Sequence, residues 1–106
     1  FALPVLTLIS QLTLAATFDP EAGKALWYQD VDGRSCTNCH GQSPSDTGKH
    51  NKTGRPIEPM ALSVNPQRFT DTAKTEKWFR RNCRWTLGRE CSPQEKGDIL
   101  TWLKQQ

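Results

Sequence analysis

The chain has 106 residues and a formal net charge of +3; 35% of its residues are hydrophobic and its mean hydropathy is −0.70. The length predicts one domain over residues 1–106, and a chain of this size and composition needs reinforcement beyond its own thin core. The modest charge argues against a nucleic-acid-binding protein.

Residues 1–16 combine an apolar run with small residues at its end, as the hydrophobic stretch and cleavage region of a secretory signal do. No basic segment precedes the run, and polar residues interrupt it. It is also shorter than the roughly 20 apolar residues that a transmembrane helix needs. We expect an N-terminal helix from about Val5 to Ala16, with a retained signal remnant as the alternative. Residues 17–106 form the rest of the domain.

A second helix is marked by Asp19, which is a suitable N-cap, and by Pro20, which suits the first helical position. It should run to about Gln29. Gly23 and Trp27 are four residues apart, so a position without a side chain and a large aromatic side chain share one helix face. This arrangement is typical of a helix that crosses another closely.

A long irregular stretch follows, from Gln42 to about Asn65, rich in Gly, Pro, Ser, Thr and Lys. A loop of this length is unusual in a compact domain unless it wraps around something. We expect a third helix from a cap at Thr70 or Asp71 to about Arg84.

The last helix opens with Ser92, Pro93, Gln94 and Glu95, which together form a capping box with proline at its first position. Its apolar face comprises Ile99, Leu100, Trp102 and Leu103. No strand pattern competes along the chain, so the predicted fold class is all-α.

The most specific signal is Cys36-Thr37-Asn38-Cys39-His40. Two thiols three residues apart can add to the two vinyl groups of one porphyrin, and the next residue then places an imidazole at the iron. A thioredoxin-like dithiol would need a βαβ setting, and a zinc site would need a second ligand pair. The motif therefore predicts one covalently bound haem c, attached at Cys36 and Cys39 and ligated by His40.

Cys83 and Cys91 are separated by eight positions and bracket a turn. Proteins with this haem motif are attached to their cofactor after export in most cells, and an oxidising compartment favours a disulfide. Two free thiols are the alternative. We expect a periplasmic protein with a Cys83–Cys91 disulfide that contributes about 2–3 kcal/mol to stability.

The sixth position on the iron separates electron carriers from ligand-binding proteins. Met60 is the single methionine, and the irregular stretch could carry it to the iron or leave it packed against the haem. His50 lies in a polar run and is expected to be solvated.

Asn82 lies three residues after Phe79 and four after Trp78, so on a helix it shares their apolar face. A polar amide there needs a partner. Spacing alone favours a helix-end asparagine that bonds to the backbone. The alternative is an iron ligand, because a hard amide oxygen suits ferric iron better than ferrous iron.

The stretches SCTNCHG, KTGRPIEPM, NPQRFTDTAKTEKWFRRNC and GRECSPQEKGDILTWLKQQ resemble the sphaeroides haem protein family over about residues 19–106. The resemblance implies a class I-like cytochrome c fold, with about four helices around one covalently bound haem. It also implies that Asn82 is the sixth haem ligand, that it leaves on reduction, and that Cys83 and Cys91 form a disulfide. Oxygen or nitric oxide would then bind near Trp78, Phe79 and Met60, and a dihaem cytochrome c would exchange electrons with the protein.

Three function classes follow from these expectations. The first is a haem protein that binds oxygen or nitric oxide, and the second is a simple electron carrier with Asn82 or Met60 as a permanent ligand. The third is an oxygen or nitrogen-oxide reductase, which ranks last because no general acid or base stands at an identifiable distal position. Membrane contact is expected only through a partner.

Basic residues cluster between positions 74 and 89: Lys74, Lys77, Arg80, Arg81, Arg84 and Arg89. They form either a solvated helix face or a docking patch for an acidic redox partner.

Overall fold

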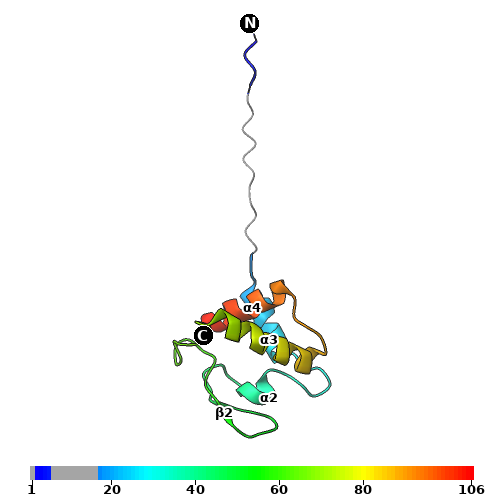
Figure 1. Ribbon diagram of the computed structural model, residues 1–106, viewed down its shortest axis with the longest axis vertical. Coiled ribbons are helices and arrows are strands. Elements are labelled where there is room, and N and C mark those ends of the chain that lie inside the picture. Colours follow the sequence, from blue (N-terminus) through cyan, green and yellow to red (C-terminus); the bar gives the residue numbers. More distant parts are fainter. Residues whose placement is uncertain (1, 6–16) are drawn as a thin grey trace.

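The computed structural model describes residues 2–5 and 17–106. Over these residues it contains six short elements, α1 (Pro20–Tyr28), α2 (Thr37–His40), β1 (Gly48–Lys49), β2 (Pro56–Ile57), α3 (Thr72–Leu87) and α4 (Pro93–Lys104) (Figure 1). The helix expected over residues 5–16 falls outside the described residues, except for Val5, which is not helical. No helix in the described ranges is long and apolar enough to cross a membrane.

Helix α1 begins as its sequence predicts. The carboxylate of Asp19 accepts a hydrogen bond from the backbone N–H of Glu21 at 2.9 Å, and Pro20 occupies the first turn. The helix ends at Tyr28, one residue before the expected end. A second bond ties this start to α4, because the N–H of Asp19 donates to the carboxylate of Asp98 at 2.7 Å.

Helices α1 and α4 form the most extensive contact between elements of the fold. Gly23 makes it possible, because a Cβ at this position would collide with the backbone carbonyl of Asp98. The close crossing predicted for Gly23 and Trp27 is therefore confirmed. Beside it lies the buried apolar core of Trp27, Ile99, Trp102 and Leu103, which we call the core cluster.

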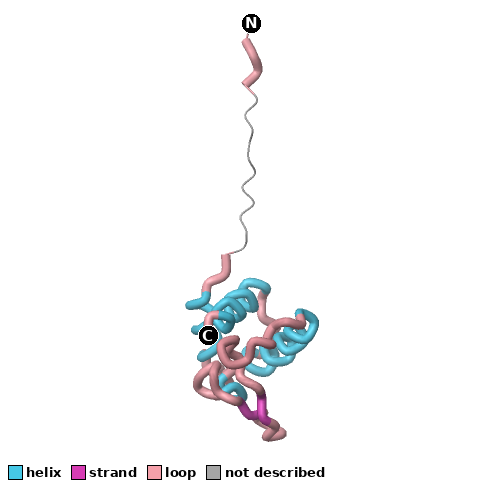
Figure 2. Tube along the Cα trace, turned by 90° about the vertical axis from the view of Figure 1, so that its left-hand side faces the viewer, coloured by secondary structure: helices cyan, strands magenta, loops and turns pink. Residues whose placement is uncertain are grey.

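Residues 41–71 are mainly turns, but they contain one element that the sequence did not predict. β1 and β2 pair antiparallel, with Gly48 opposite Ile57 and Lys49 opposite Pro56. A ladder of two residues per strand is too short to show an alternating pattern, so the expectation of no strands was wrong here. Figure 2 shows this hairpin, in magenta, at the end of the molecule away from residue 17.

Helix α3 starts after Asp71, whose carboxylate accepts from the N–H of Lys74 at 3.1 Å. It continues to Leu87, about one turn beyond the predicted end at Arg84. The reason is Gly88, which adopts φ 72° and donates its N–H to the carbonyl of Arg84 at 3.0 Å. A left-handed glycine is a common helix terminator.

Helix α3 makes few close backbone contacts with other elements, and side-chain links tie it to α4 and to the residues just before α4. Near its start, Lys96 of α4 pairs with Glu76 at 2.9 Å. Near its end, Cys83 and Cys91 form a disulfide with their Cα atoms 5.7 Å apart. The capping box predicted for α4 is present, with Ser92 and Glu95 each bonding to the other's backbone N–H.

Candidate haem-binding site

The haem motif lies on a short, well-fixed segment. A turn precedes it, closed by paired backbone bonds between Val31 and Arg34 at 2.9 and 3.0 Å. The amide of Asn38 donates to the carbonyl of Gly33 at 2.9 Å, which ties the motif back to this turn. α2 then carries Cys39 and His40 in one helical turn, and Cys36 is its N-cap. Neither cysteine of the motif takes part in a disulfide.

Cys36 lies in apolar surroundings, packed against the core cluster. Burial raises the pKa of its thiol to about 11, although the nearby side chain of Thr86 in α3 acts in the opposite direction. The surroundings therefore disfavour a thiolate and favour a neutral sulfur. A thioether to a porphyrin vinyl group is neutral and fits this environment.

His40 is also suited to ligation. Burial, and then the charge of Arg68, lower the pKa of its imidazole to about 4, so the ring is neutral at pH 7. Its ring centroid lies 5.0 Å from that of Trp27. The Nδ1 atom is buried without a hydrogen-bond partner among the described residues. A neutral imidazole is the form that binds iron.

The hairpin rests directly on this segment, because a Cβ at Gly48 would collide with the backbone of Cys39 and His40. Within the described ranges, no three His, Cys, Asp or Glu side chains come together to hold a metal ion. The second ligand pair that a zinc site would require is thus not assembled there. Two cysteines one helical turn apart, a neutral imidazole and an adjoining apolar cluster fit a haem.

The structure brings together some of the predicted distal residues. Met60 and Phe79 both pack against the core cluster, as Cys36 does. Trp78 does not join them: its side chain is 42% exposed, and the Arg81 guanidinium lies 5.7 Å from its ring.

Asn82 lies in the interior of α3, because the helix extends to Leu87. Its side chain is exposed and makes no hydrogen bond to any described residue, so the interpretation as a backbone-bonded helix-end asparagine was wrong. Phe79 and Thr86 lie three residues before it and four after it, on the same helix face. Since Phe79 packs on the core cluster and Thr86 lies beside Cys36, this face is directed at the haem-attachment segment.

Two residues of the site were missed by the sequence analysis. The side chain of Arg68 donates to the carbonyls of Pro59 at 3.0 Å and Glu58 at 2.5 Å, and so anchors the loop that carries Met60. Phe69 packs against the core cluster with φ 64°, a left-handed conformation that costs a bulky residue about 1–2 kcal/mol. The local sequence contains only a turn signal here.

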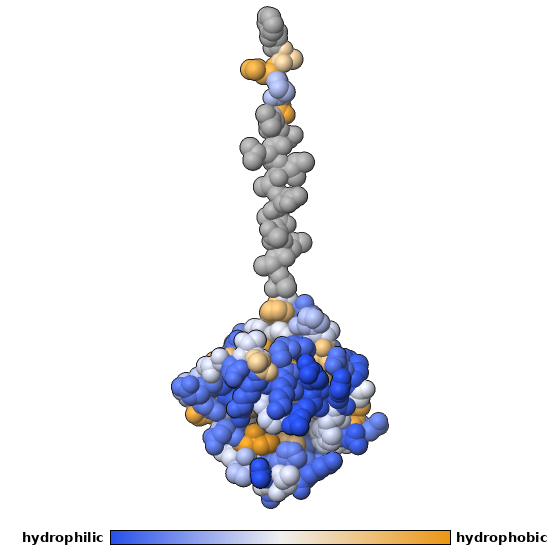
Figure 3. Space-filling model, viewed as in Figure 1, coloured by the Kyte–Doolittle hydropathy of each residue, from blue (hydrophilic) through white to orange (hydrophobic). Residues whose placement is uncertain are grey.

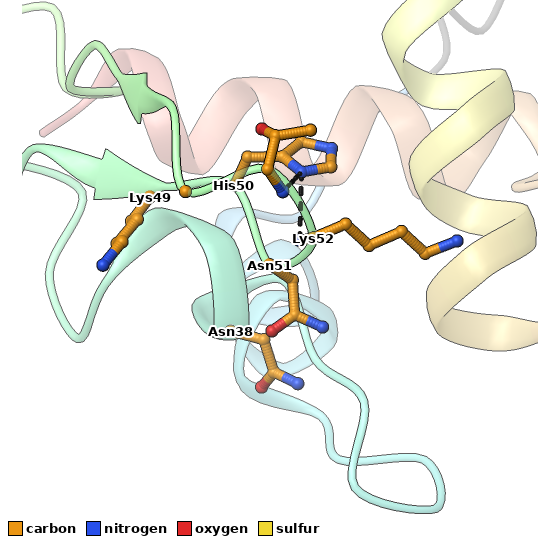
Figure 4. A pocket seen from close by; sticks show the side chains of 7 residues that line it. Asn38, Lys49, His50, Asn51 and Lys52 are labelled. Carbon is orange, nitrogen blue, oxygen red and sulfur yellow. Dashed lines mark hydrogen bonds between the residues drawn. The ribbon is translucent and has the colours of Figure 1, made fainter.

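A surface hollow is lined by the residues of the hairpin turn together with one residue of the haem motif in α2, namely Asn38, Lys49, His50, Asn51, Lys52, Thr53 and Gly54 (Figure 4). Nδ1 of His50 accepts from the N–H groups of Lys52 and Thr53, both at 3.1 Å, so His50 stabilises the turn. The side chains of Lys49 and Lys52 extend in opposite directions rather than converging.

Comparison with known proteins agrees with this geometry. Residues 13–103 match a family model described as a domain of unknown function, DUF1924. The chain is 45% identical over 96 residues to the cytochrome c-type protein SHP of Cereibacter sphaeroides, covering 86% of this chain and 74% of that protein. The chain belongs to the SHP family of c-type cytochromes.

A solved structure of oxidised SHP, an oxygen-binding cytochrome c, matches this SHP-family chain with a TM-score of 0.79 and 45% identity, covering 86% of this chain and 85% of that one. Cytochrome c'' of Methylophilus methylotrophus is 42% identical over 69 residues, which are 65% of this chain and 48% of that protein. A solution structure of cytochrome c'', concerned with haem-ligand detachment, matches with a TM-score of 0.63 and 36% identity, covering 79% and 72% of the two chains.

These relationships confirm the expected all-α cytochrome c fold. The SHP-family chain is a monohaem c-type cytochrome with a covalently bound haem.

Proposed function

We propose that this cytochrome binds oxygen or nitric oxide at its reduced iron after Asn82 has left the metal, and that it exchanges electrons with a cytochrome partner in the periplasm. The observation that carries the proposal is the position of Asn82. Its amide has no hydrogen-bond partner among the described residues. It lies in the interior of α3, on the same helix face as Phe79 and Thr86, which is directed at the haem-attachment segment.

The haem would be attached at Cys36 and Cys39, with His40 as the axial ligand on one side. When bound, the haem supplies an iron that cycles between the ferric and ferrous states and that takes a diatomic ligand when reduced. The chain holds His40 neutral through burial, and it holds the two cysteines one helical turn apart.

Asn82 would act as a redox-dependent gate. Its amide oxygen is a hard, neutral and weak donor, which suits ferric iron and is poorly matched to ferrous iron. A diatomic ligand needs only to bind the asparagine-out state better than the asparagine-in state to shift the population. SHP is an oxygen-binding cytochrome c, and haem-ligand detachment is described for cytochrome c'', so both relatives support this proposal.

The second candidate is a simple electron-transfer cytochrome with a permanent sixth ligand. Met60 favours it, because its side chain packs on the same core cluster as Cys36 and so lies in the neighbourhood of the attachment site. Against it, the backbone N–H of Met60 is bound to the carbonyl of Pro44 at 2.9 Å, and Arg68 anchors the two preceding carbonyls. Met60 is therefore better placed to pack beside the haem than to bind the iron.

The disulfide supports the exported location. Such bonds persist in oxidising compartments and are rare in the cytosol.

The deciding experiment compares the optical and EPR spectra of the wild type with those of Asn82→Ala and Met60→Leu. We expect a low-spin ferric wild type without a methionine band, which becomes high-spin on reduction and then binds nitric oxide. Asn82→Ala should be high-spin when ferric and should bind azide faster, whereas Met60→Leu should resemble the wild type. If Asn82→Ala keeps the low-spin ferric spectrum, or if Met60→Leu loses it, the sixth ligand is Met60 and the protein is an electron carrier.

A further inference from the structure

The charge of this protein is concentrated on one helix. α3 contains five basic residues and one acidic residue. The rest of the chain contains nine basic and ten acidic residues, so it is close to neutral. The net positive charge of the whole chain therefore comes from α3, and an approaching partner experiences a directed field rather than a uniform one.

All five basic side chains of α3 are exposed, and together they form what we call the α3 basic face: Lys74, Lys77, Arg80, Arg81 and Arg84. Figure 3, in the same view as Figure 1, shows strongly hydrophilic residues over the region where α3 runs. Among the described residues, only Arg84 of this set has an ion-pair partner, Glu90 at 2.9 Å. The one acidic residue of the helix, Glu76, is engaged by Lys96.

Aromatic groups border this face. Trp78 is 42% exposed, with the guanidinium of Arg81 5.7 Å from its ring centre. At the far end of the helix, Arg34 lies 5.5 Å from the ring of Trp85 and donates to the Trp85 carbonyl at 3.4 Å. Tryptophan and arginine are enriched where proteins dock, since both bury large areas and still make polar contacts.

The Trp85 border of this face reaches the haem-attachment segment through Arg34. Arg34 is two residues before Cys36, and Thr86 of α3 lies beside Cys36. A protein seated on Trp85 and the adjoining basic residues would therefore lie near an attachment point of the haem. An electron could therefore enter without contact between the partner and Asn82, the proposed iron ligand.

We propose that the α3 basic face, with Trp78 and Trp85 at its border, docks the acidic surface of the redox protein that supplies electrons to this cytochrome. The inference rests on the proposed function, because it names the surface through which that exchange takes place. The step is the transfer of one electron from the reduced partner, which is oxidised, to the ferric iron, which becomes ferrous. No proton is transferred, and the release of Asn82 in the proposed function follows this step.

The chain offers a matched control surface. The hairpin turn also carries two exposed lysines, Lys49 and Lys52, but their side chains diverge and a histidine-stabilised turn separates them. The double variants Lys77→Glu with Arg80→Glu, and Lys49→Glu with Lys52→Glu, change the net charge by the same amount at exposed positions. Neither includes a residue assigned to the haem site.

The probe is a reduced plant-type ferredoxin, an acidic protein with a potential of roughly −400 mV. Stopped-flow absorbance at low ionic strength follows its reduction of the ferric holoprotein. We expect the second-order rate constant to fall about tenfold in the α3 double variant and less than twofold in the hairpin variant. Added salt should lower the wild-type rate and remove the difference, because it screens the charges. Reduction by neutral lumiflavin semiquinone should be equal in all three proteins.

Other outcomes would overturn the inference. Equal ferredoxin rates in the two variants, a larger loss in the hairpin variant, or a wild type that accepts electrons from lumiflavin but not from ferredoxin would each do so. Charge-dependent binding to phosphatidylglycerol vesicles without an effect on the ferredoxin rate would instead assign the face to a membrane. Nitric oxide binding by the reduced proteins, measured separately, tests the proposed function, so the two ideas can fail independently.

Discussion

Gly23 of α1 lies directly against the backbone carbonyl of Asp98 in α4. No side chain separates the two helices at this point, and the core cluster that adjoins Cys36 is built around their crossing. The first prediction follows from this contact.

Gly23→Ala should destabilise the holoprotein by about 1–3 kcal/mol, because a methyl group at the crossing overpacks the interface against backbone that cannot rotate away. Alanine is a better helix former than glycine by about 1 kcal/mol, so helix propensity alone would stabilise the variant. A lower free energy of unfolding therefore indicates overpacking at the helix crossing. Urea unfolding measures it. Ala25→Val, at an exposed position of α1, is the control and should cost less than about 1 kcal/mol. A stabilised Gly23→Ala would contradict the crossing.

The Cys83–Cys91 disulfide gives the second prediction. Replacing both cysteines by serine should lower the free energy of unfolding by about 2–3 kcal/mol, because the unfolded chain regains the freedom of a short loop. Both positions are buried, so the added hydroxyl groups contribute to the loss. Reduction of the wild type by a phosphine should reproduce most of the effect and should leave the variant unchanged. Equal stabilities of oxidised and reduced wild type would contradict a structural role.

The capping box of α4 predicts a pH dependence. Glu95 bonds to Arg89 at 2.8 and 2.9 Å and to the N–H of Ser92 at 2.9 Å, and these bonds lower its pKa from 4.5 to about 2. Because the folded-state pKa is depressed, the stabilisation is fully present above about pH 4.5 and is lost as the pH falls through about 2.

Glu95→Gln keeps a capping side chain but removes the charge. The stability difference between wild type and this variant should therefore be largest near neutral pH and should shrink between about pH 4.5 and 2. Urea unfolding at several pH values measures this difference. Glu90→Gln, which removes only the exposed pair with Arg84, serves as the control. A difference that stays constant with pH would rule out the ionised cap.

The fourth prediction tests the proposed gate by replacing Asn82 with a stronger ligand instead of removing the ligand. Asn82→His should supply a ligand that binds ferrous as well as ferric iron, since imidazole suits both states. The reduced variant should stay low-spin, and its rate of nitric oxide binding should fall at least about tenfold because the histidine must first leave. Arg81→His, one position earlier in α3, should keep wild-type spectra and rates. If Asn82→His still becomes high-spin on reduction, position 82 does not face the iron.

The starts of the helices could be predicted because they depend on neighbouring residues. Asp19 with Pro20, and Ser92 with Glu95, act within one turn of the chain, and the haem motif is equally local. The end of α3 was placed about one turn too early, at Arg84, whereas the left-handed Gly88 terminates the helix after Leu87. That error made Asn82 resemble a helix-end residue.

The remaining differences depend on contacts distant in sequence. Thr86 lies beside Cys36, fifty positions away, and Arg68 binds carbonyls of the loop that carries Met60. No pattern in the neighbouring residues indicates either contact. The haem fold class was predictable, whereas the geometry around the distal face required the structure.

The four cysteines of the chain serve two chemical roles, disulfide formation and haem attachment, and the two pairs differ in how far they are buried. Cys83 and Cys91 are each 6% exposed, whereas Cys36 and Cys39 are half-buried thiols in a segment that must stay reduced until its cofactor arrives. Thiol–disulfide exchange requires access to the sulfur. In the folded chain a reductant can therefore reach the haem-attachment thiols more readily than the buried bond between Cys83 and Cys91.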